Sequence, residues 1–253
     1  MFRKVAIVAF EGCAPLDVVG PYEVLAAARQ VQERRGRRDL GYAPFLVAPA
    51  AKAIRGESGL ALLPDISLGK LAARGGRSLH TLMVAGGSGA RRAAGDRTIT
   101  RAIARLAGRA TRVSSVCTGA FVLGAAGLLD GKRATTHWAR CDELAKACPG
   151  ARVEREPIYV RDGRVWTSAG VTAGIDLALA MVEEDLGREV AAFVARWLVV
   201  FVRRAPWAKF LLRTLKMARA KFNYSCVRTN SAKSAWIFSI RCSTWAILFK
   251  WME

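Results

Sequence analysis

Cys117 is the residue of this sequence that is best placed to do chemistry. It lies in the middle of residues 112–127, where the β-branched Val113 and Val116 precede it and Thr118 begins a run rich in alanine and glycine. This pattern predicts a short strand that turns sharply into a helix, with the cysteine exposed at the corner. The first amides of such a helix favour a thiolate over a thiol. We therefore expect a nucleophile or a ligand-contacting thiol; the alternative is a small buried apolar side chain.

A nucleophile needs a proton acceptor or donor within hydrogen-bonding distance. Asp17 is the candidate, because it follows the first predicted strand, residues 4–10, and the loops after neighbouring parallel strands lie at one edge of a sheet. The alternative is that the Asp17 side chain only caps the N-terminus of a helix near Gly20.

Gly86 and Gly87 follow another buried strand, residues 79–85. Their backbone N–H groups could stabilise an oxyanion that forms during a reaction. The alternative is a tight turn with no role in chemistry. The segment matches neither a phosphate-binding loop nor a dinucleotide fingerprint, because the Lys-Ser/Thr pair and the third glycine are missing.

His137 lies in the polar segment 135–138 and could orient a loop or a ligand, or only pack in the structure. The other histidine, His80, falls in a predicted strand, where we expect a structural role. Two histidines without clustered cysteines or carboxylates do not predict a metal site. We expect no metal and no cofactor.

Strands and helices alternate along the sequence, and the strands are almost continuously apolar, as buried parallel strands are. This pattern predicts an α/β fold: a doubly wound, mostly parallel, flavodoxin-like sheet sandwiched by helices, with the cysteine at a nucleophile elbow. The predicted strands are 4–10, 42–48, 79–85 and 113–116, with hairpins at 54–63 and 158–167. The predicted helices are 22–33, 98–107, 118–126, 140–147, 171–186 and 188–202.

The composition bounds the location and the partners of the chain. Its 253 residues carry a formal net charge of +20, which we interpret as an arginine-rich solvated surface and, alternatively, as general nucleic-acid binding. The six cysteines fit neither a zinc pattern nor a disulfide framework, which is typical of the reducing cytoplasm. We expect no signal peptide and no membrane span, because no stretch of about 18 uncharged apolar residues occurs.

The composition changes at about residue 205. Residues 1–205 contain 26 Arg and 5 Lys, whereas residues 206–253 contain 4 Arg, 5 Lys and four of the seven tryptophans. We predict a domain over 1–205 and an atypical basic tail over 206–253. Our hypothesis is that the tail has a different coding origin, such as a frameshift or an insertion.

Five linked motifs stand out along the chain: Leu16–Val24, Ser115–Gly119, Leu123–Leu129, Arg133–Trp138 and Val171–Asp176. Together they make the sequence similar to the ThiJ/PfpI superfamily, whose fold is that of class I glutamine amidotransferases. The protease members of this superfamily have a histidine directly after the cysteine. Thr118 stands at that position here, so the resemblance does not imply a peptidase dyad.

Two branches of this superfamily share these motifs, and the chain resembles the sensor domain of GlxA-type AraC-family transcription regulators more closely. The segments with that resemblance are 158–170, 182–191 and 198–204. It implies a homodimeric domain that senses a ligand, which makes an enzyme the less expected of the two interpretations, and that binds a small nitrogenous metabolite at Asp17, Gly86, Gly87, Cys117, Thr118 and His137. DNA binding would need the branch's helix-turn-helix domain, for which 206–253 is too short, so we expect a truncated regulator.

The second branch is the isonitrile hydratases, which add water to an isonitrile carbon. By resemblance to that branch, Cys117 would be the nucleophile, Asp17 the acid and Thr118 the neighbouring hydroxyl. This enzyme is the alternative function that the sequence leaves open.

Overall fold

The computed structural model describes residues 2–37, 39–73 and 79–200. The predicted tail, the predicted boundary at residue 205 and the last two residues of the predicted helix 188–202 lie outside these ranges.

A seven-stranded sheet forms the centre of the described residues, in the order β10-β11-β7-β6-β1-β2-β5. All neighbouring strands are parallel except β10, which pairs antiparallel with β11 at one edge. The predicted mostly parallel α/β fold is thus confirmed. The strands are β1 Arg3–Val8, β2 Tyr42–Ala48, β5 Ile66–Ser67, β6 Leu79–Val84, β7 Arg112–Ser115, β10 Tyr159–Asp162 and β11 Val165–Ser168.

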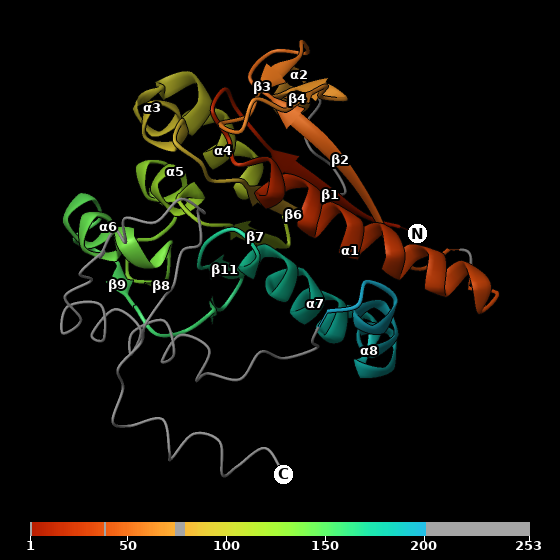
Figure 1. Ribbon diagram of the computed structural model, residues 1–253. Coiled ribbons are helices and arrows are strands. Elements are labelled where there is room, and N and C mark those ends of the chain that lie inside the picture. The colour runs from red at the N-terminus through yellow and green to blue at the C-terminus, as the bar shows by residue number, and fades with distance from the viewer. Residues whose placement is uncertain (1, 38, 74–78, 201–253) are drawn as a thin grey trace, which may run out of the picture. The chain divides into compact units, whose positions relative to one another are not determined.

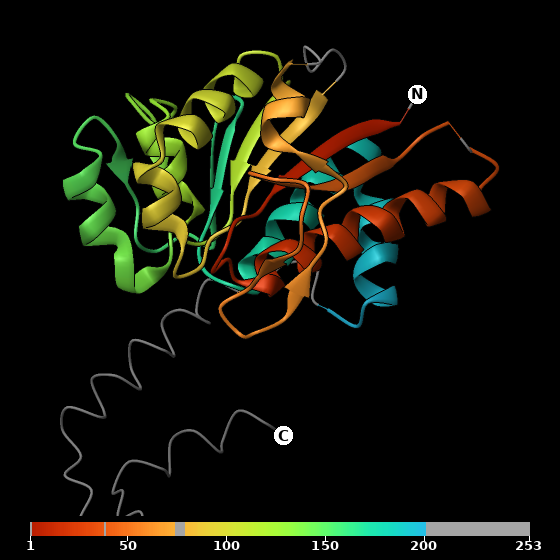
Figure 2. The same ribbon diagram turned by 90° about the horizontal axis from the view of Figure 1, so that it is seen from above.

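Helices cover both faces of this sheet. Helices α1, α7 and α8 lie together on one face, and α2, α3, α4 and α5 lie on the other, with α6 beside α5 (Figures 1 and 2). The helices are α1 Pro15–Arg34, α2 Leu68–Ala73, α3 Ala90–Gly95, α4 Arg97–Ala107, α5 Gly119–Ala125, α6 Cys141–Ala147, α7 Ala173–Leu186 and α8 Arg188–Trp197. Two short strand pairs lie apart from the sheet: β3 Ile54–Arg55 with β4 Ala61–Leu62, and β8 Arg133–Ala134 with β9 Arg152–Val153.

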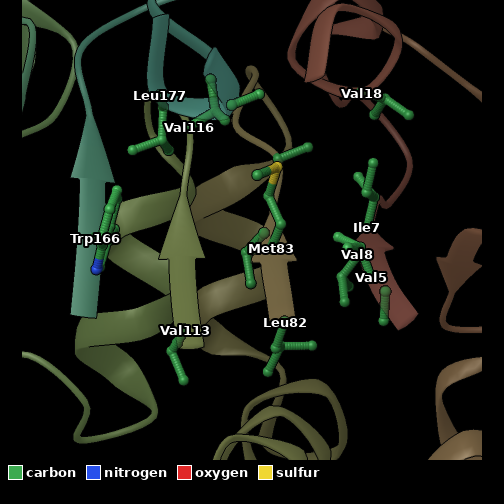
Figure 3. Close-up of a cluster of buried hydrophobic side chains, with 14 of the residues drawn as sticks. Val5, Ile7, Val8, Val18, Leu82, Met83, Val113, Val116, Trp166 and Leu177 are labelled. Atoms are coloured by element: carbon green, nitrogen blue, oxygen red, sulfur yellow. The ribbon is translucent and has the colours of Figure 1, made fainter. Parts of the chain in front are cut away.

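The middle of the sheet is buried on both faces, as the continuous apolar strands predict. Ile7, Leu82 and Val113 come from three adjacent strands and are completely buried (Figure 3). Leu177 of α7 and Val116 pack at the end of the sheet where β7 finishes (Figure 3). The core therefore fixes the carboxyl ends of the central strands, where a functional site is expected in this type of fold.

The predicted starts of two helices are wrong, and both helices begin near the carboxyl ends of the central strands. Helix α1 begins at Pro15 rather than near residue 22, because proline, which has no N–H to pair, is well tolerated in the first turn. Asp17 is thereby part of the first helical turn. Helix α7 begins at Ala173, since Val171 has a φ of 51° and cannot continue a right-handed helix.

A buried ion pair between Arg112 of β7 and Asp185 of α7 lies at the other end of the sheet, where β7 begins. The guanidinium makes two hydrogen bonds of 2.8 and 2.7 Å to the carboxylate, and the Tyr42 hydroxyl donates a third at 2.7 Å. Both charged side chains are less than a tenth exposed. Removing one partner would leave the other charge buried and unpaired.

We expect Asp185→Ala to lower the free energy of unfolding by about 3–5 kcal/mol, measured by denaturant unfolding. Glu184→Ala is the matched control, since Glu184 also pairs two oxygens with an arginine, Arg161, but on the exposed surface of the same helix. It should cost about 0–1 kcal/mol. Equal losses in the two variants would contradict the assignment of Asp185 as a buried anchor.

Candidate functional site

Three predicted site segments meet at the carboxyl ends of β1, β6 and β7. Asp17 follows β1, Gly86 follows β6 and Cys117 follows β7. A Cβ atom added to Gly86 would lie 2.8 Å from both the Asp17 carboxylate oxygen Oδ2 and the Cys117 Cβ atom. The loops therefore converge as the sequence predicts, and Gly86 must be glycine because both functional side chains approach its Cα.

Cys117 occupies the strand-to-helix corner that the sequence predicts. Its φ of 55° is unusual for a residue with a side chain. The Cys117 N–H donates to the carbonyl oxygen of Ala169 at 2.9 Å, and its own carbonyl oxygen accepts from the Thr136 hydroxyl at 2.7 Å. Gly119 completes the turn, since a Cβ there would lie 2.3 Å from the Val84 carbonyl oxygen. These contacts hold the strained backbone in place.

The predicted exposed thiolate at Cys117 is wrong in both respects. The residue is only 6% exposed, and burial, with the charge of Asp17 second, raises the pKa of its thiol to about 11. The amides of Thr118 and Val171 and the Thr118 hydroxyl act on the sulfur and lower its pKa, but by less. Helix α5 has only seven residues, and its N-terminus does not offset the loss of water around the sulfur. At neutral pH the resting group is a thiol.

Asp17 is a buried carboxyl group and not a helix cap. Ala14 occupies the N-cap position of α1, and the Asp17 oxygen Oδ2 accepts a hydrogen bond of 2.9 Å from the Gly86 N–H. Burial raises the pKa of Asp17 to about 7; the Gly86 bond lowers it and the charge of Glu57 raises it further. Asp17 can therefore take up or release a proton near neutral pH.

The amides of Gly86 and Gly87 already have partners within the protein. Gly86 donates to Asp17, and Gly87 donates to the Thr118 hydroxyl oxygen at 2.8 Å. The Thr118 hydroxyl donates in turn to the Gly87 carbonyl oxygen at 2.9 Å. These amides thus hold the side chains of the site, whereas the predicted oxyanion role would require free N–H groups. The amides directed at the sulfur are those of Thr118 and Val171.

His137 lies beside the loop that carries Val171. Its Nδ1 accepts from the Ala139 N–H at 3.3 Å, and its ring is 5.3 Å from that of the exposed Trp138. A Cβ added to Gly170 would lie 2.2 Å from the His137 Cδ2 atom. This close packing of the ring against the residue before Val171 favours the structural alternative, in which His137 holds the loop that carries Val171.

A family model described as DJ-1/PfpI family matches residues 3–184. The chain belongs to the DJ-1/PfpI family. This result confirms the superfamily that the motifs indicate.

Named relatives in this family include both an enzyme and a regulator. The chain is 37% identical to an isonitrile hydratase of Pseudomonas putida over 194 residues, which are 77% of each chain. It is 35% identical to the transcriptional regulator GlxA of Rhizobium meliloti over 122 residues, which are only 37% of that regulator. A solved ThiJ/PfpI family protein from Pseudomonas syringae is 29% identical, with a TM-score of 0.69 over 87% of both chains. The hydratase match is thus more extensive than the regulator match, contrary to the order in which the sequence motifs placed the two branches.

Three residues near this candidate site were not among the predicted ones: Arg91, Val171 and Glu57. Arg91 of α3 stacks 4.9 Å above the Phe121 ring and forms an ion pair with Glu143 of α6. The Glu143 bond raises the pKa of Arg91 most, and the Cys117 sulfur adds to this only when it is ionised. The Arg91-Arg92 pair after the glycine loop is the only sequence signal for Arg91. Val171 begins the motif Val171–Asp176, but its backbone strain is not visible in a sequence. Glu57 has no signal, because loop contacts are not visible there either.

Within the described residues, no group of three or more His, Cys, Asp or Glu side chains is arranged to hold a metal ion. The helices described there include none that is both long and apolar enough to cross a membrane.

We expect Gly170→Ala to displace His137 and to lower the free energy of unfolding by roughly 1–3 kcal/mol, as overpacking does. Gly69→Ala is the control, because Gly69 lies in helix α2 with open space around its Cα. That variant should be about 0.5–1 kcal/mol more stable than the wild type. Thermal unfolding of the two variants measures both changes, and a neutral Gly170→Ala variant would show that the His137 contact is not a constraint.

Proposed function

We propose that this chain is an isonitrile hydratase, which converts an isonitrile R–N≡C and water into the formamide R–NH–CHO. The observation that carries the proposal is the meeting of a buried thiol, Cys117, with a buried carboxyl, Asp17, whose pKa is about 7. The extended similarity to the Pseudomonas putida hydratase supports it. An uncharged substrate such as an isonitrile suits a site in which both groups are nearly free of water.

In the first step, the Cys117 thiol adds to the terminal carbon of the isonitrile. Ionised Asp17 accepts the thiol proton as the sulfur–carbon bond forms, and then returns that proton to the same carbon. The product is a thioimidate, R–N=CH–S, on Cys117. The thiol pKa of about 11 means that the sulfur keeps its proton until a substrate arrives, and the amides of Thr118 and Val171 stabilise the charge that develops on it.

In the second step, water adds to the thioimidate carbon. Asp17 accepts one proton from the water and passes it to the nitrogen. The carbon–sulfur bond then breaks, the sulfur takes the hydroxyl proton, and the formamide leaves with Cys117 again a thiol. Thr118 takes no proton in this scheme. Its hydroxyl makes two hydrogen bonds to the Gly87 backbone and so holds the turn at Cys117 against the loop at Gly86 and Gly87.

The test is an assay of the wild-type protein with a simple alkyl isonitrile in ¹⁸O-labelled water. We expect ¹⁸O-labelled formamide, and a thioimidate adduct on the Cys117 peptide by mass spectrometry of a rapidly quenched reaction. The value of kcat/KM should rise with pH through about 7 as Asp17 ionises. Absence of both formamide and adduct over a panel of isonitriles would overturn the proposal.

A second function, supported by the partial similarity to GlxA and by the motifs at 158–170 and 182–191, is ligand sensing in an AraC-type regulator. In that case a homodimer would bind a small amine or amide at Asp17, Gly86, Gly87, Cys117, Thr118 and His137 without turnover, and DNA contact would need a helix-turn-helix domain. Calorimetry over a metabolite panel tests it. Unchanged affinities in Cys117→Ala and Asp17→Ala variants would count against this function.

A further inference from the structure

Three consecutive backbone amides after β6 each bind a side chain from a different part of the chain. Gly86 donates to Asp17 of α1, Gly87 donates to Thr118 beside the cysteine, and Ser88 donates to the Glu57 oxygen Oε2 at 2.7 Å. Two of these side chains belong to the proposed reaction site. The third, Glu57, lies between β3 and β4, and its carboxylate is bound by the same loop after β6.

Glu57 is held at two points although it is exposed. Besides the bond from Ser88 to its carboxylate, its own N–H donates to the Cys13 carbonyl oxygen at 2.8 Å. The preceding residue, Gly56, packs so tightly on Pro15 that an added Cβ would lie 2.4 Å from that ring. The segment is thereby fixed against residues 13–15, directly before Asp17, and the Ser88 bond holds its carboxylate two residues along the loop from the amide that binds Asp17.

We propose that Glu57 is a positioning residue that acts through Asp17. Its carboxylate favours the protonated form of Asp17, the group that carries the proton between Cys117 and the substrate. This inference rests on the proposed function, in which Asp17 carries that proton. Glu57 itself touches neither the sulfur nor the substrate in this scheme.

The electrostatics of the site agree with this role. Burial is the main cause that raises the pKa of Asp17, and the charge of Glu57 adds to it, while the Gly86 bond opposes both. The titratable groups that face Asp17 are Glu57, Cys13 and Cys117. Both thiols have a pKa raised to about 11 and are neutral at pH 7, so within this set the Glu57 carboxylate is the source of the like charge on Asp17. A like charge favours the protonated carboxyl.

The experiment is a ¹³C NMR titration of Asp17 in the resting protein, with the resonance assigned by its loss in Asp17→Asn. Glu57→Gln is the informative variant, because its amide oxygen can still accept from Ser88 while the charge is gone. We expect the Asp17 midpoint to fall from about 7 in the wild type by on the order of half a pH unit. The rise of kcat/KM with pH should move by the same amount with KM unchanged.

Glu11→Gln is the matched control. Like Glu57, Glu11 accepts a hydrogen bond from a backbone amide, here that of Arg55 in β3 at 2.9 Å, and the substitution removes the same charge. It should leave the Asp17 midpoint in place. A Glu57→Gln midpoint equal to the wild-type value overturns the inference, whatever the activity. If the midpoint moves but no isonitrile is hydrated, the electrostatic role of Glu57 holds and the proposed reaction is the part that fails.

Discussion

Replacement of Cys117 by serine is expected to lower kcat/KM for isonitrile hydration by roughly 10³-fold or more. Serine keeps the size of the side chain and its fit under the Thr118 and Val171 amides. Its hydroxyl, however, is far harder to deprotonate than a thiol, and a carboxylate with a pKa of about 7 cannot serve it as an effective base. The variant should therefore fold normally and bind the isonitrile, but form no covalent adduct. Formamide release and intact-protein mass measure the two effects.

Cys148→Ser is the control for this variant. Cys148 is another free, buried cysteine, whose sulfur packs against Gly124 of α5, away from Asp17. Its replacement should leave turnover within a few-fold of the wild type. Residual hydration by Cys117→Ser at a tenth of the wild-type rate would show that the sulfur is not the nucleophile. It would then favour direct addition of water with Asp17 as the base.

The sequence was sufficient to place three candidate residues at the same end of the sheet, and the reason is physical. In a parallel sheet the loops that follow the strands all lie at one end, so the strand pattern placed Asp17, Gly86 and Cys117 there. The adjacency of β1, β6 and β7, which brings the three residues together, came from the structure. The turn at Cys117 was equally predictable, because a β-branched strand followed by Thr118, Gly119 and a helical run has few alternative conformations.

The ionisation of the site could not be predicted in the same way. The helix after Cys117 favours a thiolate, and that was the expectation, but the balance depends on how much water the fold removes from the sulfur. Burial is the largest cause of the raised pKa of both Cys117 and Asp17. Burial depends on packing by α1, α5 and the loop at Val171, which are distant in the sequence, so no local pattern encodes it.

The role of the glycine loop also depended on contacts that a sequence does not show. Gly86 and Gly87 could be recognised as a tight turn or as a source of backbone N–H groups, but the partners of those N–H groups could not. Their amides bind Asp17 and Thr118 rather than a reaction intermediate. The same loop brings in Glu57, which no motif of the chain includes.

Asp17→Asn is expected to have two opposite effects: a loss of kcat/KM of roughly 10²–10⁴-fold and a gain in stability at pH 8 of roughly 2–4 kcal/mol. The amide oxygen of asparagine can still accept from Gly86, so the loop is retained, but no group remains to carry the proton. Turnover of an isonitrile and urea unfolding of the same preparations measure the two quantities. Asp65→Asn is the control and should change turnover little. The Asp65 carboxylate likewise accepts a hydrogen bond from one backbone amide, that of Leu46 at 2.7 Å.

The stability gain follows from the direction of the Asp17 pKa. It is 3.8 for an ordinary aspartate and about 7 in the folded protein. Between these values a rise in pH removes a proton from the unfolded chain but not from the folded one, so the wild-type free energy of unfolding falls across this window and is constant above it. The asparagine side chain of the variant does not titrate, so the advantage of the variant should disappear near pH 4. An Asp17→Asn protein that loses activity but shows the wild-type dependence of stability on pH would mean that Asp17 is ionised in the resting site, and that the thiol proton then has a stronger acceptor elsewhere.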